Sequence, residues 1–134
     1  MLLSVLWVGS PRLDVDTLLA GHPGLRTDDV WHVGEPRGAH RTTTDNGFSL
    51  TLVDDEQEKT WAALVQRTLA ELDRLRPLLE DIQKLGEVPE VDFGVSVGTR
   101  EVFVRSCRFG ADDLRRFVQL GVNVCVTAYP TTEE

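Results

Sequence analysis

The chain has 134 residues, of which 41% are hydrophobic and 27% are charged, a composition typical of a globular domain. This length can bury a hydrophobic core without disulfides, so a single domain over residues 1–134 is expected. The formal net charge of -8 argues against nucleic acid as a partner, because binding to phosphates needs a basic face. No apolar run approaches the roughly 20 residues that a membrane-spanning helix requires, so no membrane association is predicted.

The apolar residues 1–8 are interpreted as a first strand. They lack the basic leader and the long apolar region of a secretory signal, and a Gly-Ser-Pro turn follows at 9–11. Cys107 and Cys125 lie in apolar stretches and form no CxxC pair, which favours buried free thiols over a disulfide. These features together predict a cytoplasmic protein.

The next elements are short. A helix is expected after Pro11, ending at the turn signal that begins with Gly21. Residues 29–34 alternate between apolar and polar as a strand does. The polar loop over 35–47 ends in an Asn-Gly dipeptide, which predicts a turn, and residues 48–53 then alternate as another strand.

The acidic segment at 54–58 is expected to open the longest helix, which Gly86 ends, because apolar residues recur there at three- and four-residue steps. Pro77 lies inside this pattern and removes one backbone donor. We therefore expect a kink or two abutting helices, the second with Pro77 in its first turn. Trp31 and Trp61 join periodic apolar faces, which favours core anchors over a stacking platform.

The last third of the chain gives the clearest pattern. Alternating apolar residues predict strands over 91–97, 102–104 and 122–126. A helix is expected between Gly110 and Gly121, with acidic residues at its positive end and a glycine as its stop. The order β-α-β-β-α-β-β-α-β predicts an α+β sandwich of ferredoxin-like type, with an antiparallel or mixed sheet covered by helices.

Several of these signals together are similar to one bacterial family. They are Val-Trp-His-Val-Gly-Glu at 30–35, Asn-Gly-Phe at 46–48, Trp61 at the opening of a Leu-rich helix, and the ending from Leu114 to Tyr129. Over nearly the whole chain they resemble the family designated domain of unknown function 4279 (DUF4279). The closing strand departs from the resemblance, since Cys125 and Thr127 stand where more uniformly apolar or acidic residues are expected. The resemblance brings no catalytic residues, and some small acidic proteins of this kind look like immunity proteins that sit beside secreted toxins.

No catalytic, metal or cofactor signature is legible in the sequence. The histidines His22, His32 and His40 have no zinc-ligand spacing, and there is no glycine-rich phosphate motif. These absences favour a protein that is not an enzyme and has no metal site and no cofactor. An enzyme that uses carboxylates and His40 as acid and base is a third hypothesis, which requires the fold to gather distant residues in a cleft.

The first candidate binding site is the acidic segment that is expected to open the longest helix. Its carboxylates belong to Asp54, Asp55, Glu56 and Glu58. They can meet a basic partner, which an acidic protein attracts over a distance. Carboxylates in a first helical turn are also stabilised by the helix dipole without any partner.

The second candidate binding site is the polar loop. Its side chains belong to Glu35, Arg37, His40 and Arg41. Two guanidinium groups on a loop can grip an anionic ligand. A solvated hairpin loop also commonly collects Arg, His and Gly without binding anything.

The leading hypothesis is a non-enzymatic cytoplasmic binding protein. Its most concrete form is an immunity-type protein that neutralises a toxin, a basic protein, through an acidic face. The alternative is a small domain that binds an anionic ligand or has a regulatory role through the polar loop. The sequence predicts no oligomeric state.

Overall fold

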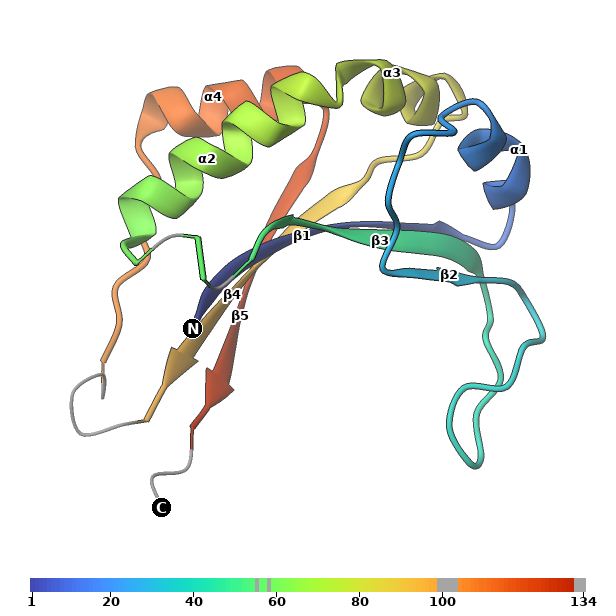
Figure 1. Cartoon of the computed structure of the whole chain (residues 1–134), viewed down its shortest axis with the longest axis horizontal. Helices are drawn as coiled ribbons and strands as arrows, with labels where there is room; N and C mark the ends of the chain where they lie inside the picture. The colour runs from blue at the N-terminus through green and yellow to red at the C-terminus, as the bar shows by residue number, and fades with distance from the viewer. Residues whose placement is uncertain (55, 58, 99–103, 132–134) are drawn as a thin grey trace.

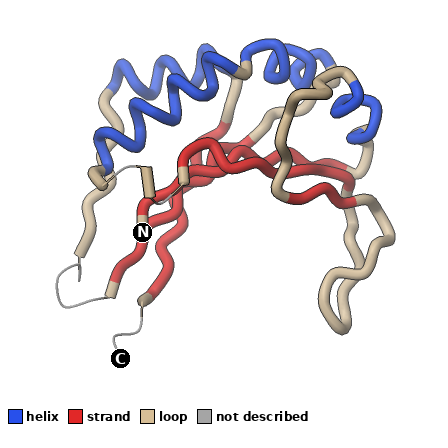
Figure 2. Tube along the Cα trace, viewed as in Figure 1, coloured by secondary structure: helices blue, strands red, loops and turns tan. Residues whose placement is uncertain are grey.

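The structure is a computed structural model that describes residues 1–54, 56–57, 59–98 and 104–131. In this part of the chain the strands are β1 (Leu2–Ser10), β2 (Asp29–Trp31), β3 (Asn46–Val53), β4 (Glu90–Val97) and β5 (Asn123–Pro130). The helices are α1 (Val15–Ala20), α2 (Trp61–Arg74), α3 (Arg76–Lys84) and α4 (Ala111–Leu120). All of these helices lie on one side of a curved sheet, and no described helix covers its other side (Figure 1, Figure 2).

The strands form one mixed sheet in the order β2-β3-β1-β4-β5. β1 is antiparallel to both β3 and β4, and β2 is antiparallel to β3. The edge strand β5 is parallel to β4, which requires a crossover connection, and α4 supplies it. The predicted α+β class and a mixed sheet covered by helices are therefore confirmed.

The sheet separates a core face from an open face. Because successive side chains of a strand point to opposite sides, the even-numbered residues of β1 lie under the helices. Leu6, Phe48 and Phe93 have no exposed surface and pack in one buried cluster with helical leucines such as Leu69 and Leu72. Burial of this apolar surface is the main force that holds the helices on the sheet.

Pro77 separates two helices, as the sequence predicted. α2 ends at Arg74, α3 begins at Arg76, and Pro77 occupies the first turn of α3, where no intrahelical donor is needed. Leu75 links the two helices and is itself buried. Both helices lie on the same side of the curved sheet (Figure 1), and each buries apolar residues such as Leu69 of α2 and Leu79 of α3.

An aromatic cluster fixes the segment that precedes α4. The ring of Phe109 lies 5.3 Å from that of Trp61 and 5.4 Å from that of Phe93, in edge-to-face contacts. The Trp61 indole also donates a hydrogen bond of 2.8 Å to the Arg108 carbonyl. Trp61 thus packs on the core as predicted, at the junction of α2 with this segment.

Two predicted strands differ from those in the structure. The strand predicted over 29–34 ends at Trp31, because a turn follows in which the Glu35 amide donates to the His32 carbonyl at 3.1 Å. The strand predicted over 102–104 is wrong at Val104, which is irregular and 78% exposed. Residues 102 and 103 lie outside the described residues.

The Asn46-Gly47 dipeptide does not form the predicted turn and instead begins β3. The side chain of Asn46 accepts a 2.8 Å hydrogen bond from the Val33 amide and donates one of 3.3 Å to the Pro11 carbonyl. It therefore ties the entry of β3 to two neighbouring loops, a role that local sequence does not reveal.

Candidate binding face on the open side of the sheet

The described acidic residues of the 54–58 segment, Asp54 and Glu56, precede the helix that this segment was predicted to open. α2 starts at Trp61, and the side chain of Thr60 caps it by accepting from the Ala63 amide at 3.2 Å. The side chain of Asp54 makes a local hydrogen bond, in which its carboxylate accepts from the backbone amide of Glu56 at 3.0 Å. The expected stabilisation by the helix dipole is therefore wrong for Asp54 and Glu56, while residues 55 and 58 lie outside the described residues.

The charged groups of the polar loop have partners of their own. The carboxylate of Glu35 bonds to Nδ1 of His32, whose Nε2 meets an oxygen of Asp16 at 3.0 Å. These two carboxylates raise the pKa of His32, with the hydrogen bond to Asp16 as the larger cause. Glu35 is thus held towards α1.

The other half of the loop forms a narrow hairpin. Its isolated bridge joins Pro36 to Thr42, and the Arg37 amide donates to the Arg41 carbonyl at 2.8 Å. His40 and Arg41 are exposed in this hairpin. Glu35 and Arg37 are each engaged with different partners, so the loop does not gather its charges around one anion site.

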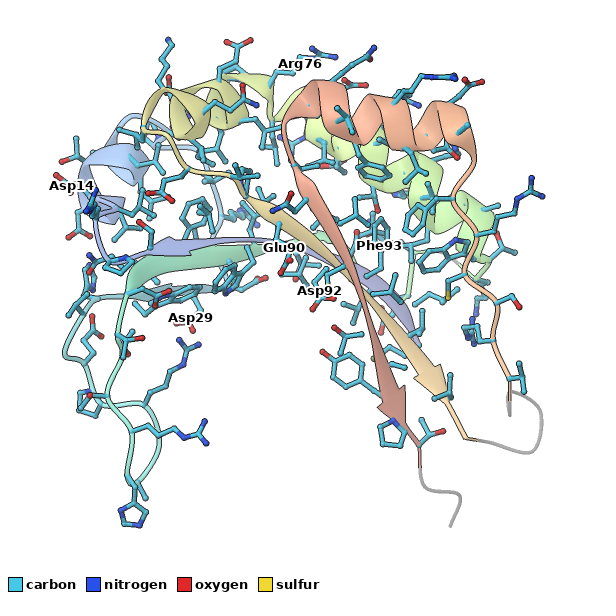
Figure 3. The ribbon with its side chains drawn as sticks, turned by 180° about the vertical axis from the view of Figure 1, so that it is seen from behind. Asp14, Asp29, Arg76, Glu90, Asp92 and Phe93 are labelled. Atoms are coloured by element: carbon cyan, nitrogen blue, oxygen red, sulfur yellow. The ribbon has the colours of Figure 1, made fainter. Side chains whose placement is uncertain are left out.

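The open face carries aromatic and acidic side chains. In register across the strands, Asp29 lies beside Ser49, Ser49 beside Trp7, and Trp7 beside Glu90. Along the next row Val5 lies between Thr51 and Asp92, and Asp92 is beside Cys125. Figure 3 labels three of these acidic residues, Asp29, Glu90 and Asp92, on the strands of the sheet.

Trp31 is buried, but on the open face and not in the core under the helices. Its ring stacks on Trp7 with centroids 5.8 Å apart, and its indole donates to Asp45 at 3.0 Å. Gly47 makes room for this ring, since a Cβ there would lie 2.5 Å from it. The sequence was right that Trp31 is an anchor and wrong about the face that it anchors.

Arg37 lies against this aromatic pair. The carbon of its guanidinium group is 4.9 Å from the centroid of Trp31, a cation–π distance, and one of its nitrogens is 3.7 Å from Asp29. The open face thus holds one guanidinium group between an indole ring and a carboxylate.

A pocket of about 380 Å³ lies next to this arrangement. Its lining consists of Val5, Trp7, Ser49, Glu90, Asp92 and Tyr129. The Asp92 carboxylate accepts a 2.8 Å hydrogen bond from the Thr127 hydroxyl, which fixes its orientation. The Tyr129 ring approaches β4 over Gly94, where a Cβ would lie 3.3 Å from the ring.

The charge of this region is strongly negative. Its carboxylates belong to Asp28, Asp29, Asp45, Glu90 and Asp92, which lie on the open face or contact its side chains. Within the described residues, Arg37 is the only side chain that forms an ion pair with any of them. An acidic surface with exposed aromatic rings is suited to a cationic group.

A histidine and a carboxylate meet elsewhere, between α1 and α3. Nε2 of His22 lies 2.8 Å from Asp81, and pockets of about 400 and 380 Å³ are lined by one or other of these residues. The Thr17 hydroxyl that lines the second pocket donates to Asp14 at 2.8 Å, so it is paired with that carboxylate and not with His22. Within the described residues, the side-chain partner of His22 is a carboxylate and not a hydroxyl or thiol group.

Cys107 and Cys125 are free, as predicted, but half-buried where full burial was expected. Partial burial raises the pKa of the Cys107 thiol, an effect that the nearby Arg105 reduces. Over the described ranges no cluster of three or more His, Cys, Asp or Glu side chains is placed to hold a metal ion. Among the described helices, none has the length and apolar character needed to cross a membrane.

Comparison of the chain with protein-family models, curated proteins and solved structures gives no match. The candidate site therefore rests on the geometry of the open face.

Sequence reasoning missed the residues of this pocket. Trp7 occurs in a predicted strand, Glu90 directly before one and Tyr129 three residues after one, but each strand was interpreted for its core side only. The sequence does contain a pattern that could have indicated these residues: in each strand, aromatic and acidic residues alternate with the buried ones and therefore lie on the opposite face. That signal places them on one face, whereas their proximity depends on strand order.

Proposed function

We propose that the protein is a non-enzymatic binding protein that holds a basic protein partner on the open face of its sheet. The observation that carries this proposal is the pocket at which Trp7 and Tyr129 meet the carboxylates of Glu90 and Asp92. Aromatic rings are enriched in protein interfaces, and desolvated carboxylates favour a cationic partner. In this proposal, the acidic residues that bind the partner lie on the open face of the sheet and not in the segment at 54–58.

In its most concrete form, the proposal is an immunity-type protein of the cytoplasm that covers the basic cleft of a toxin. The net charge of -8 supports it, because opposite charges accelerate the encounter of two proteins. The resemblance to DUF4279 supports it as well, and membership of that family is part of the proposal. We also propose that β1 to β4 follow the ferredoxin-like order, with α4 and β5 added at one edge.

The interleaved connections support this topology. The α1 connection joins β1 to β2, with β3 between them in the sheet. The α2–α3 connection joins β3 to β4, with β1 between them. Two split β-α-β units of this kind define the ferredoxin-like arrangement.

The anion-binding alternative draws less support from the contacts. The charge of Arg37 is offset by Asp29, and Glu35 is bonded to His32. The enzyme hypothesis based on His40 has no cleft to support it among the pockets described here, none of which His40 lines.

The test compares two variants of equal charge. One carries Asp29→Asn, Glu90→Gln and Asp92→Asn on the open face, and the control carries Glu56→Gln, Glu80→Gln and Asp112→Asn elsewhere. Proteins that the tagged parent captures from a lysate of its source organism are identified, purified and titrated against all three forms.

The proposal expects one basic partner whose Kd rises at least about tenfold for the open-face variant and stays within about twofold for the control. Capture of no partner, or equal loss with both variants, would contradict it. A partner that is a toxin and regains its activity with the open-face variant would support the immunity-type form.

A further inference from the structure

We infer that the pocket lined by Trp7, Glu90, Asp92 and Tyr129 is a guanidinium site that takes one arginine side chain of the partner. This inference rests on the proposed function for the source of the arginine. The binding of a guanidinium group in the pocket can be tested without the partner protein, because a small molecule that carries this group serves as the probe.

The protein itself provides the pattern for such a site. Arg37 lies over the indole ring of Trp31 at 4.9 Å while Asp29 approaches its guanidinium group to 3.7 Å. Both contacts occur on the same face of the sheet as the pocket. The open face therefore already binds one guanidinium group by a ring and a carboxylate.

The pocket repeats these two elements one step across the sheet. Trp7 stacks on Trp31 and is the cross-strand neighbour of Glu90, so the Cβ atoms of Trp7 and Glu90 are about 5 Å apart. Asp92 adds a second carboxylate on the same strand, beside Val5. Among the ion pairs of the described residues, none involves either carboxylate, so no described arginine pairs with the second ring-and-carboxylate set.

The groups are held in place before any ligand arrives. Thr127 bonds to one oxygen of Asp92 at 2.8 Å, which leaves the other oxygen for a ligand. Trp7 is 39% exposed and Tyr129 is 46% exposed, so both keep ring surface available to a cation. Preorganised groups of this kind lose little freedom when they bind.

A guanidinium group suits this set better than an ammonium group. It is planar and stacks on an indole ring, while its fork of N–H donors can serve two carboxylates at once. An ammonium group is more strongly hydrated and presents no plane to the ring. The pocket thus favours arginine over lysine.

The test is an NMR titration of the ¹⁵N-labelled protein with N-acetylarginine amide. We expect saturable shifts at the Trp7 indole and at the backbone amides of residues 5–7 and 90–92. The neutral isostere N-acetylcitrulline amide should give no saturable shift there, and N-acetyllysine amide should bind at least about threefold more weakly. Equal responses to the arginine and citrulline compounds, or shifts centred elsewhere, would overturn the inference.

Two double variants, each of which replaces one Glu by Gln and one Asp by Asn, locate the site. Glu90→Gln with Asp92→Asn should weaken arginine binding at least about fivefold, while Glu80→Gln with Asp112→Asn should leave it unchanged. Unchanged amide shifts away from the pocket verify that each variant is folded. Equal binding by both variants would overturn the assignment.

The outcomes separate the two proposals. If N-acetylarginine amide does not bind but the captured partner depends on the open face, the guanidinium site is wrong and the proposed function stands. If N-acetylarginine amide binds in the pocket and no protein is captured, the guanidinium site stands and the proposed function is wrong.

Discussion

At residue 47 the chain has no room for a side chain. A Cβ there would lie 2.3 Å from the Val8 carbonyl oxygen and 2.5 Å from the Trp31 ring, and the carbonyl belongs to the paired backbone of β1. The glycine is needed for close packing, since Gly47 is not among the residues with positive φ. The absence of a side chain at Gly47 allows the Trp31 ring to pack against β3 on the open face of the sheet.

We therefore expect Gly47→Ala to lower the free energy of unfolding by about 2–3 kcal/mol, because the added methyl group overpacks a rigid site. Gly24→Ala is the control, since a Cβ at Gly24 meets nothing within 4 Å, and it should stay within about 1 kcal/mol of the parent. Urea unfolding followed by circular dichroism measures both. Equal midpoints for the two variants would show that β3 shifts to accommodate the methyl group.

His32 links α1 to the polar loop in a pH-dependent way. Its contacts with Asp16 and Glu35 raise its pKa above the ordinary value of 6.5. A raised pKa means that the folded state favours the protonated ring, so this stabilisation is complete below 6.5 while the carboxylates stay ionised. It is lost as the pH rises through the raised pKa of the folded protein.

The expected result is a decrease in the parent's stability across this pH range that His32→Gln lacks. NMR titration of the His32 ring measures the pKa directly, and Asp16→Asn should move it back towards 6.5. A ring that titrates at 6.5 in the parent would contradict the contacts described here.

At the scale of elements, one buried polar contact joins α2 to the central strand. The hydroxyls of Ser4 and Thr68 are 2.7 Å apart, and both residues have no exposed surface. Thr68 donates to the Leu64 carbonyl at 2.7 Å, so the Ser4 hydroxyl must donate to Thr68. The contact fixes how far along β1 the helix sits.

Removing the acceptor should cost more than removing the donor. Thr68→Val leaves the Ser4 hydroxyl buried without a partner, at a cost of about 2 kcal/mol, whereas Ser4→Ala leaves Thr68 with its carbonyl and costs about 1 kcal/mol. The double variant should cost less than the sum, because no unpaired hydroxyl remains. A double-mutant cycle in urea tests this, and additive costs would mean that water replaces the missing partner.

The sequence predicted the elements well where their pattern is local. Pro77 marked the boundary between α2 and α3, and Gly121 stops α4 in the left-handed conformation that glycine favours, with φ of 73°. It failed where tertiary contacts decide, as at Val104, whose apolar side chain is exposed outside any strand. Trp7 and Glu90 lie side by side on the open face only because β1 and β4 are neighbours, and the alternation within either strand does not predict the strand order.

At the scale of the whole molecule, the buried hydrophobic residues that the structure describes form one cluster, with Trp31 on the open face as the exception. It runs from Leu2 in β1 through the helices to Val122 ahead of β5. No boundary within this cluster divides the helical layer from the sheet. Unfolding of either layer would expose the apolar face of the other.

We therefore expect cooperative unfolding in a single transition. Far-UV circular dichroism reports the helices, and tryptophan fluorescence reports Trp7 and Trp31 on the open face together with Trp61 at the start of α2. The two signals should give the same urea midpoint. A fluorescence midpoint clearly below the dichroism midpoint would mean that the open face of the sheet unfolds before the helical layer does.

The central position of β1 has a consequence for biosynthesis. β1 leaves the ribosome before the other strands described here, yet Leu6 pairs with Leu50 on one side and Val91 on the other. At about 5–20 residues per second, the nascent strand waits several seconds for its second neighbour. During that interval Leu6 and Trp7 are exposed with an unpaired backbone edge, so translation speed and chaperone supply should govern the yield of this protein more than its final stability does.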